Sequence, residues 1–127
     1  MATKISLRDL QVDGKYEPGF DTHQGITDET AGTNQGQMSR VHFPPKSRSR
    51  MHYHTNGDMI LYCLSGKTIF LVGKEKKEYV VEAGDFFCVP RGEIHCNFNP
   101  SETETVECVA LYFGCSDFYK SGKVIVE

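Results

Sequence analysis

From residue 38 onward, short runs of alternating apolar and polar residues are separated by turn residues such as Asn56-Gly57 and Ser65-Gly66. A period of two is typical of β-strands whose two faces meet different surroundings. The pattern predicts strands at 38–43, 50–54, 59–64, 67–72, 78–81, 85–89, 95–98 and 106–113. No segment keeps the spacing of an amphipathic helix for three turns, so we expect very little helix.

The two ends of the chain are less regular. Residues 11–37 are rich in Gly, Asp, Thr, Gln and Asn, which predicts turns with one short strand. Residues 122–127 alternate enough to form an edge strand, for which residues 5–10 are the expected partner. We therefore expect a single domain over 1–127, with a core barrel at about 38–113, N-terminal turns and an edge strand in 1–37, and a C-terminal edge strand in 114–127.

Eight short strands bury enough apolar surface only when they close into a barrel or a two-layer sandwich. The sequence therefore predicts an all-β fold with one core. Aromatic residues from the strands are expected to fill this core: Phe43, Phe70, Phe86, Phe87, Phe98, Tyr112 and Phe113.

Composition excludes several classes of function. The 127 residues carry a net charge of -3, which argues against a nucleic-acid partner. No apolar run approaches the roughly 20 residues of a membrane helix, and the N-terminus does not resemble a secretory signal, so we expect a cytoplasmic protein. The five cysteines include no C-x-x-C pair. They are expected to be reduced, with Cys63, Cys88 and Cys108 packed as small apolar residues in the core.

Two clusters of residues carry candidate chemistry. His52 and His54 are two positions apart, so on a strand both imidazoles project from one face, as two ligands of one metal ion would. The second cluster has the pattern G-x5-P-x-G-x2-H-x3-N, formed by Gly84, Pro90, Gly92, His95 and Asn99. Pro stops a strand, and Gly92 can adopt positive φ in a turn that directs His95 back toward the barrel. We expect His23 and His42 to lie at the surface.

The second cluster resembles the second motif of the cupin superfamily, small jelly-roll barrels also called double-stranded β-helices, at all five positions. The first cupin motif, G-x5-H-x-H-x3or4-E-x6-G, aligns with Lys46, His52, His54, Met59 and Gly66, so its two histidines and its closing Gly are present. The resemblance covers about 38–113. It implies a metal bound by His52, His54 and His95, and a homodimer, which the exposed outer face of a small barrel also favours.

The chain departs from the first motif at the glutamate ligand, where it has Met59. A thioether is a poor ligand for Fe, Mn or Ni, although it could approach copper. Asp58 could serve as a fourth ligand if the preceding loop is one residue tighter. The preferred interpretation is three histidines with open positions on one divalent transition metal: Fe, Mn, Ni, Zn or Cu, with Fe or Zn favoured. A barrel without metal is the alternative.

Arg50 shares the parity of the two histidines on their strand, so it is a candidate clamp for an anionic substrate; a salt bridge at the rim is the other interpretation. Met59 is expected to line an apolar cavity. These residues predict a mononuclear metal enzyme acting on a small organic substrate. It would either oxidise the substrate with dioxygen, or act as a Lewis acid in enolisation leading to isomerisation, cyclisation, decarboxylation or elimination. The alternative is a non-catalytic barrel that binds a small molecule or a metal.

Overall fold

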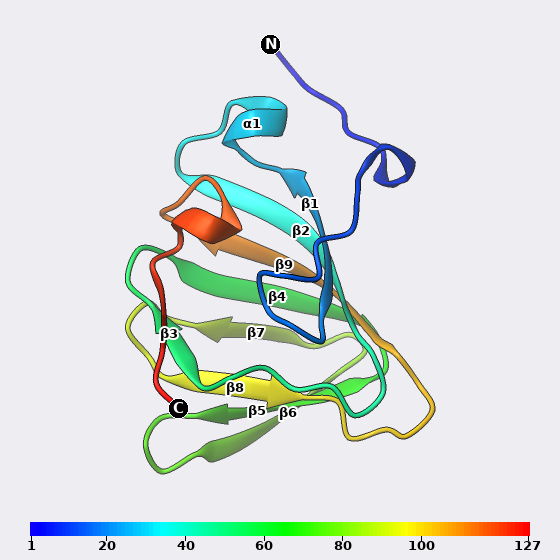
Figure 1. Ribbon diagram of the computed structural model, residues 1–127, viewed down its shortest axis with the longest axis vertical. Helices are drawn as coiled ribbons and strands as arrows, with labels where there is room; N and C mark the ends of the chain where they lie inside the picture. Colours follow the sequence, from blue (N-terminus) through cyan, green and yellow to red (C-terminus); the bar gives the residue numbers. More distant parts are fainter.

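Ten β-strands form two five-stranded antiparallel sheets that curve toward each other (Figure 1) in this computed structural model, which describes residues 1–127. One sheet has the strand order β1-β2-β9-β4-β7 and the other β10-β3-β8-β5-β6. The strands are β1 Asp21–Ile26, β2 Gly36–Phe43, β3 His52–His54, β4 Asp58–Ser65, β5 Lys67–Val72, β6 Lys77–Glu82, β7 Phe86–Val89, β8 His95–Phe98, β9 Val106–Phe113 and β10 Lys123–Ile125. Helical structure is limited to α1 (Asp28–Ala31) and two 3-10 turns, Leu7–Asp9 and Phe118–Lys120.

The eight strands expected from alternation are all present. β5, β8 and β9 have the predicted bounds, and the other five differ by no more than two residues at either end. The short strand expected within residues 11–37 is β1, and β2 also begins there, at Gly36. The prediction of an all-β jelly roll is therefore confirmed.

The pairing expected for the C-terminal strand is wrong. β10 pairs with β3, with Lys123 opposite His54 and Ile125 opposite His52, and not with residues 5–10. Leu7–Asp9 instead forms a 3-10 turn. One edge of β3 pairs with β8, and β10 pairs with the edge that would otherwise be free. The C-terminal strand satisfies the backbone groups along that edge.

The core lies between the two sheets and contains Phe43, Phe70 and Tyr112, as expected. Phe87 is partly buried against it, and Phe98 is half-buried. The expectation was wrong for Phe86 and Phe113, which are 80% and 48% exposed. Both occupy the alternate positions of their strands, and a strand that buries one face must turn its other face outward.

The second sheet carries more buried polar side chains than the first, on which Thr22, Gln37 and Ser39 are buried. Buried polar side chains gather on the second sheet and the segment before it: Ser49, His52, His54, Thr68, His95 and Asn97. Hydrogen bonds satisfy several of them, because the Asn97 amide donates to Thr68 Oγ1 at 3.0 Å and the Asn97 N–H donates to Ser49 Oγ at 2.9 Å. A functional site inside the barrel is therefore expected on this sheet.

The turn between β7 and β8 brings the two histidine clusters together. β7 ends at Val89, directly before Pro90, and Gly92 has φ 84°, as the sequence predicted. The Gly92 N–H donates to the carbonyl of His54 at 2.7 Å. Lys46 occupies the position of the first glycine in the first motif, and it has φ 61°, a left-handed conformation that glycine adopts more easily.

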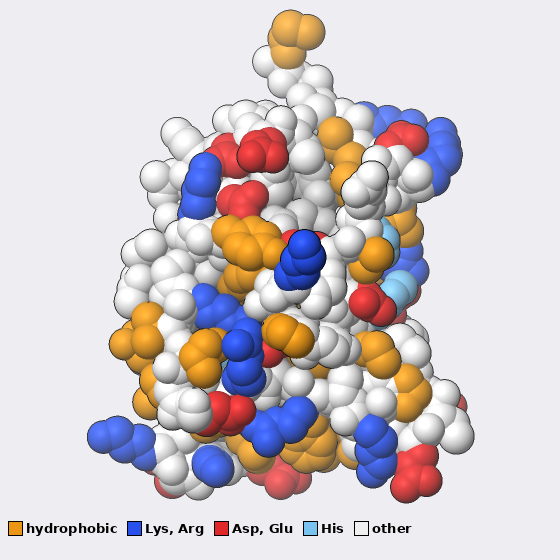
Figure 2. Space-filling view, in the orientation of Figure 1, with side chains coloured by type: hydrophobic (Ala, Val, Ile, Leu, Met, Phe, Trp, Pro, Cys, Tyr) orange, Lys and Arg blue, Asp and Glu red, His pale blue; other side chains and the backbone are white.

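All five cysteines are free thiols, and Cys63 and Cys108 are fully buried, as expected. Cys88 is exposed, which corrects the expectation that it lies in the core. The surface in Figure 2 carries acidic and basic side chains interspersed over the same face. None of the helices combines the length and the apolar character that crossing a membrane requires.

Candidate metal centre

His52 and His54 lie on β3 and are buried inside the barrel, as the alternation predicts. Nδ1 of His52 lies 2.6 Å from the carbonyl oxygen of Arg50. A carbonyl oxygen only accepts hydrogen bonds, so Nδ1 carries the proton and Nε2 keeps its lone pair. The local backbone thus sets the tautomer that can bind a metal.

His95 is the first residue of β8 and pairs directly with His52 across the sheet. Its Nδ1 donates to the carbonyl oxygen of Glu93 at 2.9 Å, so its Nε2 is also free to accept. Ligand atoms of His52, His54 and His95 all lie within 4.8 Å of one another. The tertiary structure therefore brings together the three histidines that the two motifs indicate.

His54 is held by two hydroxyl groups. Ser121 Oγ lies 2.9 Å from its Nδ1, and the Tyr112 hydroxyl lies 3.0 Å from its Nε2. In the tautomer that matches the other two histidines, Nδ1–H donates to Ser121 and Nε2 accepts from Tyr112. Such partners orient metal-binding histidines and tune their basicity.

Burial lowers the pKa of all three histidines, because the protein interior disfavours the imidazolium form. The pKa of His52 falls to about 3, through burial and then the nearby His95. The pKa of His54 falls to about 2, through burial and then His52, and burial also lowers the pKa of His95. The cluster is neutral at pH 7, which is the state that binds metal.

Asp58 and Met59 occupy opposite faces of β4. Met59 is buried and lines the cavity beside the histidines, as expected. Asp58 points outward, where Oδ1 accepts from the Arg91 backbone N–H at 2.9 Å and from Arg91 Nε at 3.2 Å. These contacts lower the pKa of Asp58. The structure does not bring Asp58 to the three histidines, because adjacent residues of a strand face opposite ways.

Arg50 lies at the rim of the barrel and not in the cavity lining. Its side chain is 43% exposed, and its Nε donates to Glu17 Oε2 at 3.0 Å. Of the two interpretations given to Arg50, this contact corresponds to the salt bridge at the rim. Its backbone carbonyl, and not its guanidinium, contacts a histidine of the site.

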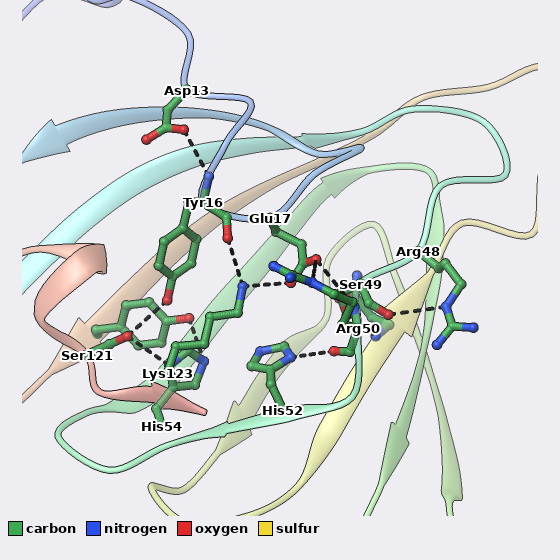
Figure 3. Close-up of polar contacts among 12 residues, drawn as sticks. Asp13, Tyr16, Glu17, Arg48, Ser49, Arg50, His52, His54, Ser121 and Lys123 are labelled. Atoms are coloured by element: carbon green, nitrogen blue, oxygen red, sulfur yellow. Dashed lines mark hydrogen bonds and ion pairs between the residues drawn. The ribbon is translucent and has the colours of Figure 1, made fainter. Parts of the chain in front are cut away.

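Sequence reasoning missed a buried ion pair at the site, formed by Glu17 and Lys123 (Figure 3). Lys123 Nζ donates to Glu17 Oε1 at 2.6 Å and to the carbonyl of Tyr16 at 3.0 Å, and it lies 4.3 Å from the centre of the Tyr16 ring. Burial lowers the pKa of Lys123. Burial alone would raise the pKa of Glu17, but the contacts with Lys123 and then Arg50 outweigh it and lower that pKa.

These residues belong to segments before and after the strands that were expected to form the barrel. An isolated bridge between Asp13 and Thr22 folds residues 14–20 back over the barrel, and Asp13 Oδ1 accepts from the Tyr16 N–H at 3.1 Å. The Tyr16 hydroxyl lies 2.9 Å from Ser121 Oγ. Residues 14–20 have no hydrophobic periodicity or motif, and the alternation of residues 122–127 predicted a strand but not its partner, so the sequence did not indicate these contacts.

His52 and His95 line a cavity of about 70 Å³ between the two sheets. Apolar and aromatic side chains, Tyr16 and Tyr112 among them, line most of it, and the other lining residues are Glu17, Thr22, Ser49, His52, His95, Asn97 and Lys123. Pockets for drug-sized ligands have volumes of roughly 300–1,000 Å³. This cavity therefore suits a molecule of few non-hydrogen atoms.

Comparisons with known proteins agree with this architecture. The family model described as "Cupin domain" matches residues 39–112. Oxalate oxidase 1 of Hordeum vulgare is 31% identical over 91 residues, which are 65% of this chain and 45% of that protein. This chain thus spans less than half the length of that relative.

Two solved structures illustrate the likeness of the fold. A polyketide cyclase from Streptomyces resistomycificus superposes with a TM-score of 0.82 at 17% identity, covering 100% of this chain and 87% of that one. A recombinant oxalate oxidase in complex with glycolate superposes with a TM-score of 0.72 at 25% identity, covering 98% of this chain and 62% of that one.

Proposed function

Because this chain belongs to the cupin family, we propose that it is a mononuclear metal enzyme that oxidises a small carboxylic acid. The observation that carries the proposal is the orientation of the three histidines. Each Nδ1 is held by an acceptor outside the cluster, so three Nε2 atoms remain for one ion. A buried set of neutral nitrogen donors, oriented in advance, is the arrangement that a transition metal needs.

Neutral imidazole suits both iron and zinc, and the proposed oxidation favours iron, because zinc has no redox chemistry. When bound, the ion would supply Lewis acidity and, if it is iron, electron transfer at the oxygen atoms of the substrate. Asp58 is paired with Arg91, and Met59 is a thioether, so neither adds a carboxylate to this set. The three histidines would leave the centre more positive than a centre with a glutamate ligand.

Lys123 supports the choice of an anionic substrate. An ammonium group has three donors, and two of them bind Glu17 and the Tyr16 carbonyl, which leaves one for a ligand in the cavity. Lys123, Arg50 and Glu17 together carry one net positive charge. A carboxylate placed between Lys123 and the metal would therefore be stabilised at both ends. The names of the oxalate oxidase relatives, and the glycolate bound to one of them, point to the same class of acid.

The side chains of the cavity support oxidation over enolisation. Removing a proton from carbon requires a base whose pKa lies near the working pH. Glu17 is the carboxylate that lines the cavity, and the contacts with Lys123 and Arg50 lower its pKa. It would hold Lys123 in place rather than accept a proton from the substrate.

Metal analysis provides the first test. We expect wild-type protein to hold close to one equivalent of metal per chain, and His52→Ala or His95→Ala to lose it. His42→Ala is the matched control, because His42 lies outside the cluster and binds Glu107. Metal retained by both site variants would contradict the proposed centre.

Oxygen consumption tests the reaction. Iron-loaded protein is incubated with two- and three-carbon acids, among them oxalate and glycolate, and we expect acid-dependent oxygen uptake. Hydrogen exchange at the carbon next to the carboxylate under argon, without oxygen uptake, would instead establish the Lewis-acid alternative. Saturable binding of an acid without turnover would establish a non-catalytic barrel.

We also propose that the protein is a homodimer joined through the outer face of the β1-β2-β9-β4-β7 sheet. The exposed apolar side chains on this face include Met38, Leu64, Phe86 and Phe113. Patches of this kind mark association sites in soluble proteins. A second copy of the chain offers the same patch, and a two-fold axis would pair the two faces.

A further inference from the structure

Tyr112 and Met59 are direct neighbours on the inner face of one sheet. Tyr112 of β9 is the register partner of Met59 of β4, and both side chains are buried and line the cavity. Met59 thus places a thioether where the first motif has a carboxylate. The side chain beside it on the neighbouring strand is Tyr112, which carries a hydroxyl.

The Tyr112 hydroxyl lies on the metal side of the histidine cluster. It is 3.0 Å from Nε2 of His54, while Nδ1 of the same ring is bound to Ser121. Nε2 is therefore the atom that His54 has left for a metal, and the hydroxyl donates to it in the structure described here. The two rings are 4.7 Å apart, so the contact is a close one.

A metal ion at Nε2 would take the lone pair to which the hydroxyl donates. Tyr112 is 6% exposed, so its hydroxyl has little access to water, and a buried hydroxyl without a partner is costly. The neighbouring Tyr16 hydroxyl, which also acts on the pKa of Tyr112, is already bound to Ser121, so the ion is the partner that the Tyr112 oxygen would gain. We propose that this oxygen is the fourth protein ligand of the metal, an inference that rests on the proposed centre.

The observed spacing fits adjacent ligands of one ion. Two donors at about 2.1 Å from an ion are about 3 Å apart at right angles and about 3.4 Å apart in a tetrahedral site, so the 3.0 Å between the Tyr112 hydroxyl and His54 Nε2 is near the spacing of two ligands of one ion. Binding of the oxygen as a phenolate would break the phenol O–H bond, and one proton per ion would leave through the cavity that Tyr112 lines to the buffer. The bound phenolate carries one negative charge, as the carboxylate of the first motif would, and the charge of the centre falls from +2 to +1.

Spectroscopy of the iron form tests this ligand directly. The full chain is loaded with Fe(II) under argon, and one equivalent of ferricyanide oxidises it to Fe(III). A phenolate bound to Fe(III) produces an intense charge-transfer band in the visible range, with resonance-enhanced tyrosine ring vibrations. We expect both signals in the wild type and neither in Tyr112→Phe. Tyr119→Phe is the matched control and keeps them, because the Tyr119 hydroxyl binds Asp13 Oδ2 and Tyr119 does not line the cavity.

Affinity for Co(II), measured by titration, provides the second readout. Tyr112→Phe is expected to bind Co(II) at least tenfold more weakly than the wild type, because losing a ligand costs no less than losing an outer partner of a ligand. Adding Met59→Glu to Tyr112→Phe returns a carboxylate to the adjacent position, and we expect it to restore affinity without the visible band. Circular dichroism of each metal-free variant checks that it is folded.

The outcomes separate the two proposals. Wild-type protein that binds neither Fe(II) nor Co(II) would overturn the metal centre itself. Wild-type protein that binds both ions, but shows no phenolate band and the same Co(II) affinity as Tyr112→Phe, would overturn only the role of Tyr112.

Discussion

Ser121 Oγ lies 2.9 Å from Nδ1 of His54, although 67 positions separate the two residues in the chain. Ser121 is fully buried, and it follows the 3-10 turn Phe118–Lys120, outside the segment that the family model matches. The C-terminal segment thus orients a metal-facing histidine of the barrel. Such outer contacts contribute to the affinity of a metal centre without touching the ion.

Removing the Ser121 hydroxyl should weaken metal binding without removing a ligand. We expect Ser121→Ala to lower Co(II) affinity about 10–100-fold, because His54 loses the partner that fixes its ring and tautomer. A competition titration with a coloured chelator measures the change. Ser116→Ala is the control, since Ser116 binds Asp28 away from the histidines. Equal affinities for the two variants would contradict this role of Ser121.

The buried pair of Glu17 and Lys123 should contribute to stability as a unit. Glu17→Gln leaves Lys123 without its carboxylate and is expected to lower the free energy of unfolding by about 3 kcal/mol. Lys123→Met is expected to cost less, because Glu17 stays paired with Arg50. The double variant should lose clearly less than the sum of the two, because no unpaired charge of the pair remains. Urea denaturation of the metal-free proteins measures all four corners of this cycle. Strictly additive losses would show that the two side chains do not interact.

The lowered pKa values of the histidines predict loss of stability in mild acid. In the unfolded chain these residues titrate near 6.5, whereas in the fold the pKa of His52 is about 3, that of His54 about 2 and that of His95 lowered. Below pH 6.5 the unfolded state binds protons that the folded state does not bind, so the free energy of unfolding falls as the pH falls. Each histidine contributes up to about 1.4 kcal/mol per pH unit.

Urea denaturation of metal-free protein at pH 7.5, 6.5 and 5.5 measures this slope. His52→Gln removes one of the titrating groups and should give a shallower decline with acid. A decline as steep as that of the wild type would assign the acid sensitivity to other groups.

Lys46 should be replaceable by glycine with a gain in stability. Its φ of 61° is a left-handed conformation that costs a residue with a Cβ atom about 1–2 kcal/mol. Glycine avoids this cost but loses more chain entropy on folding, so we expect Lys46→Gly to raise the free energy of unfolding by roughly 0.5–1 kcal/mol. The control is Lys74→Gly, at an exposed residue outside the left-handed region, which should not gain. Thermal and urea unfolding measure the stability of Lys46→Gly and Lys74→Gly against the wild type.

The outer sheet face should control the oligomeric state. Light scattering of the wild type is expected to give twice the mass of the chain, and Phe86→Lys to give the monomer mass, because a charge in a buried apolar interface is costly. Val80→Lys, at an exposed position of the other sheet, should leave the dimer intact. A wild-type monomer at working concentrations would end this proposal.

The strands and two of the three ligands follow from local pattern. Alternation with a period of two, bounded by turn residues, located β5, β8 and β9 at their observed bounds, and the same period placed His52 and His54 on one face. His95 required the longer motif that includes Gly92, whose positive φ glycine adopts more easily than other residues. The error at Phe86 arose because the type of residue was given more weight than its parity in the strand.

The surroundings of the histidines required the tertiary structure. Glu17 and Lys123 come from opposite ends of the chain, and Ser121 reaches His54 only because β10 pairs with the free edge of β3. Edge pairing and the burial of an ion pair depend on which groups remain unsatisfied after the barrel has closed. The local sequence therefore determined the barrel and the positions of its three histidines. The residues around those histidines were decided by the tertiary structure, because buried polar groups there find their partners in distant parts of the chain.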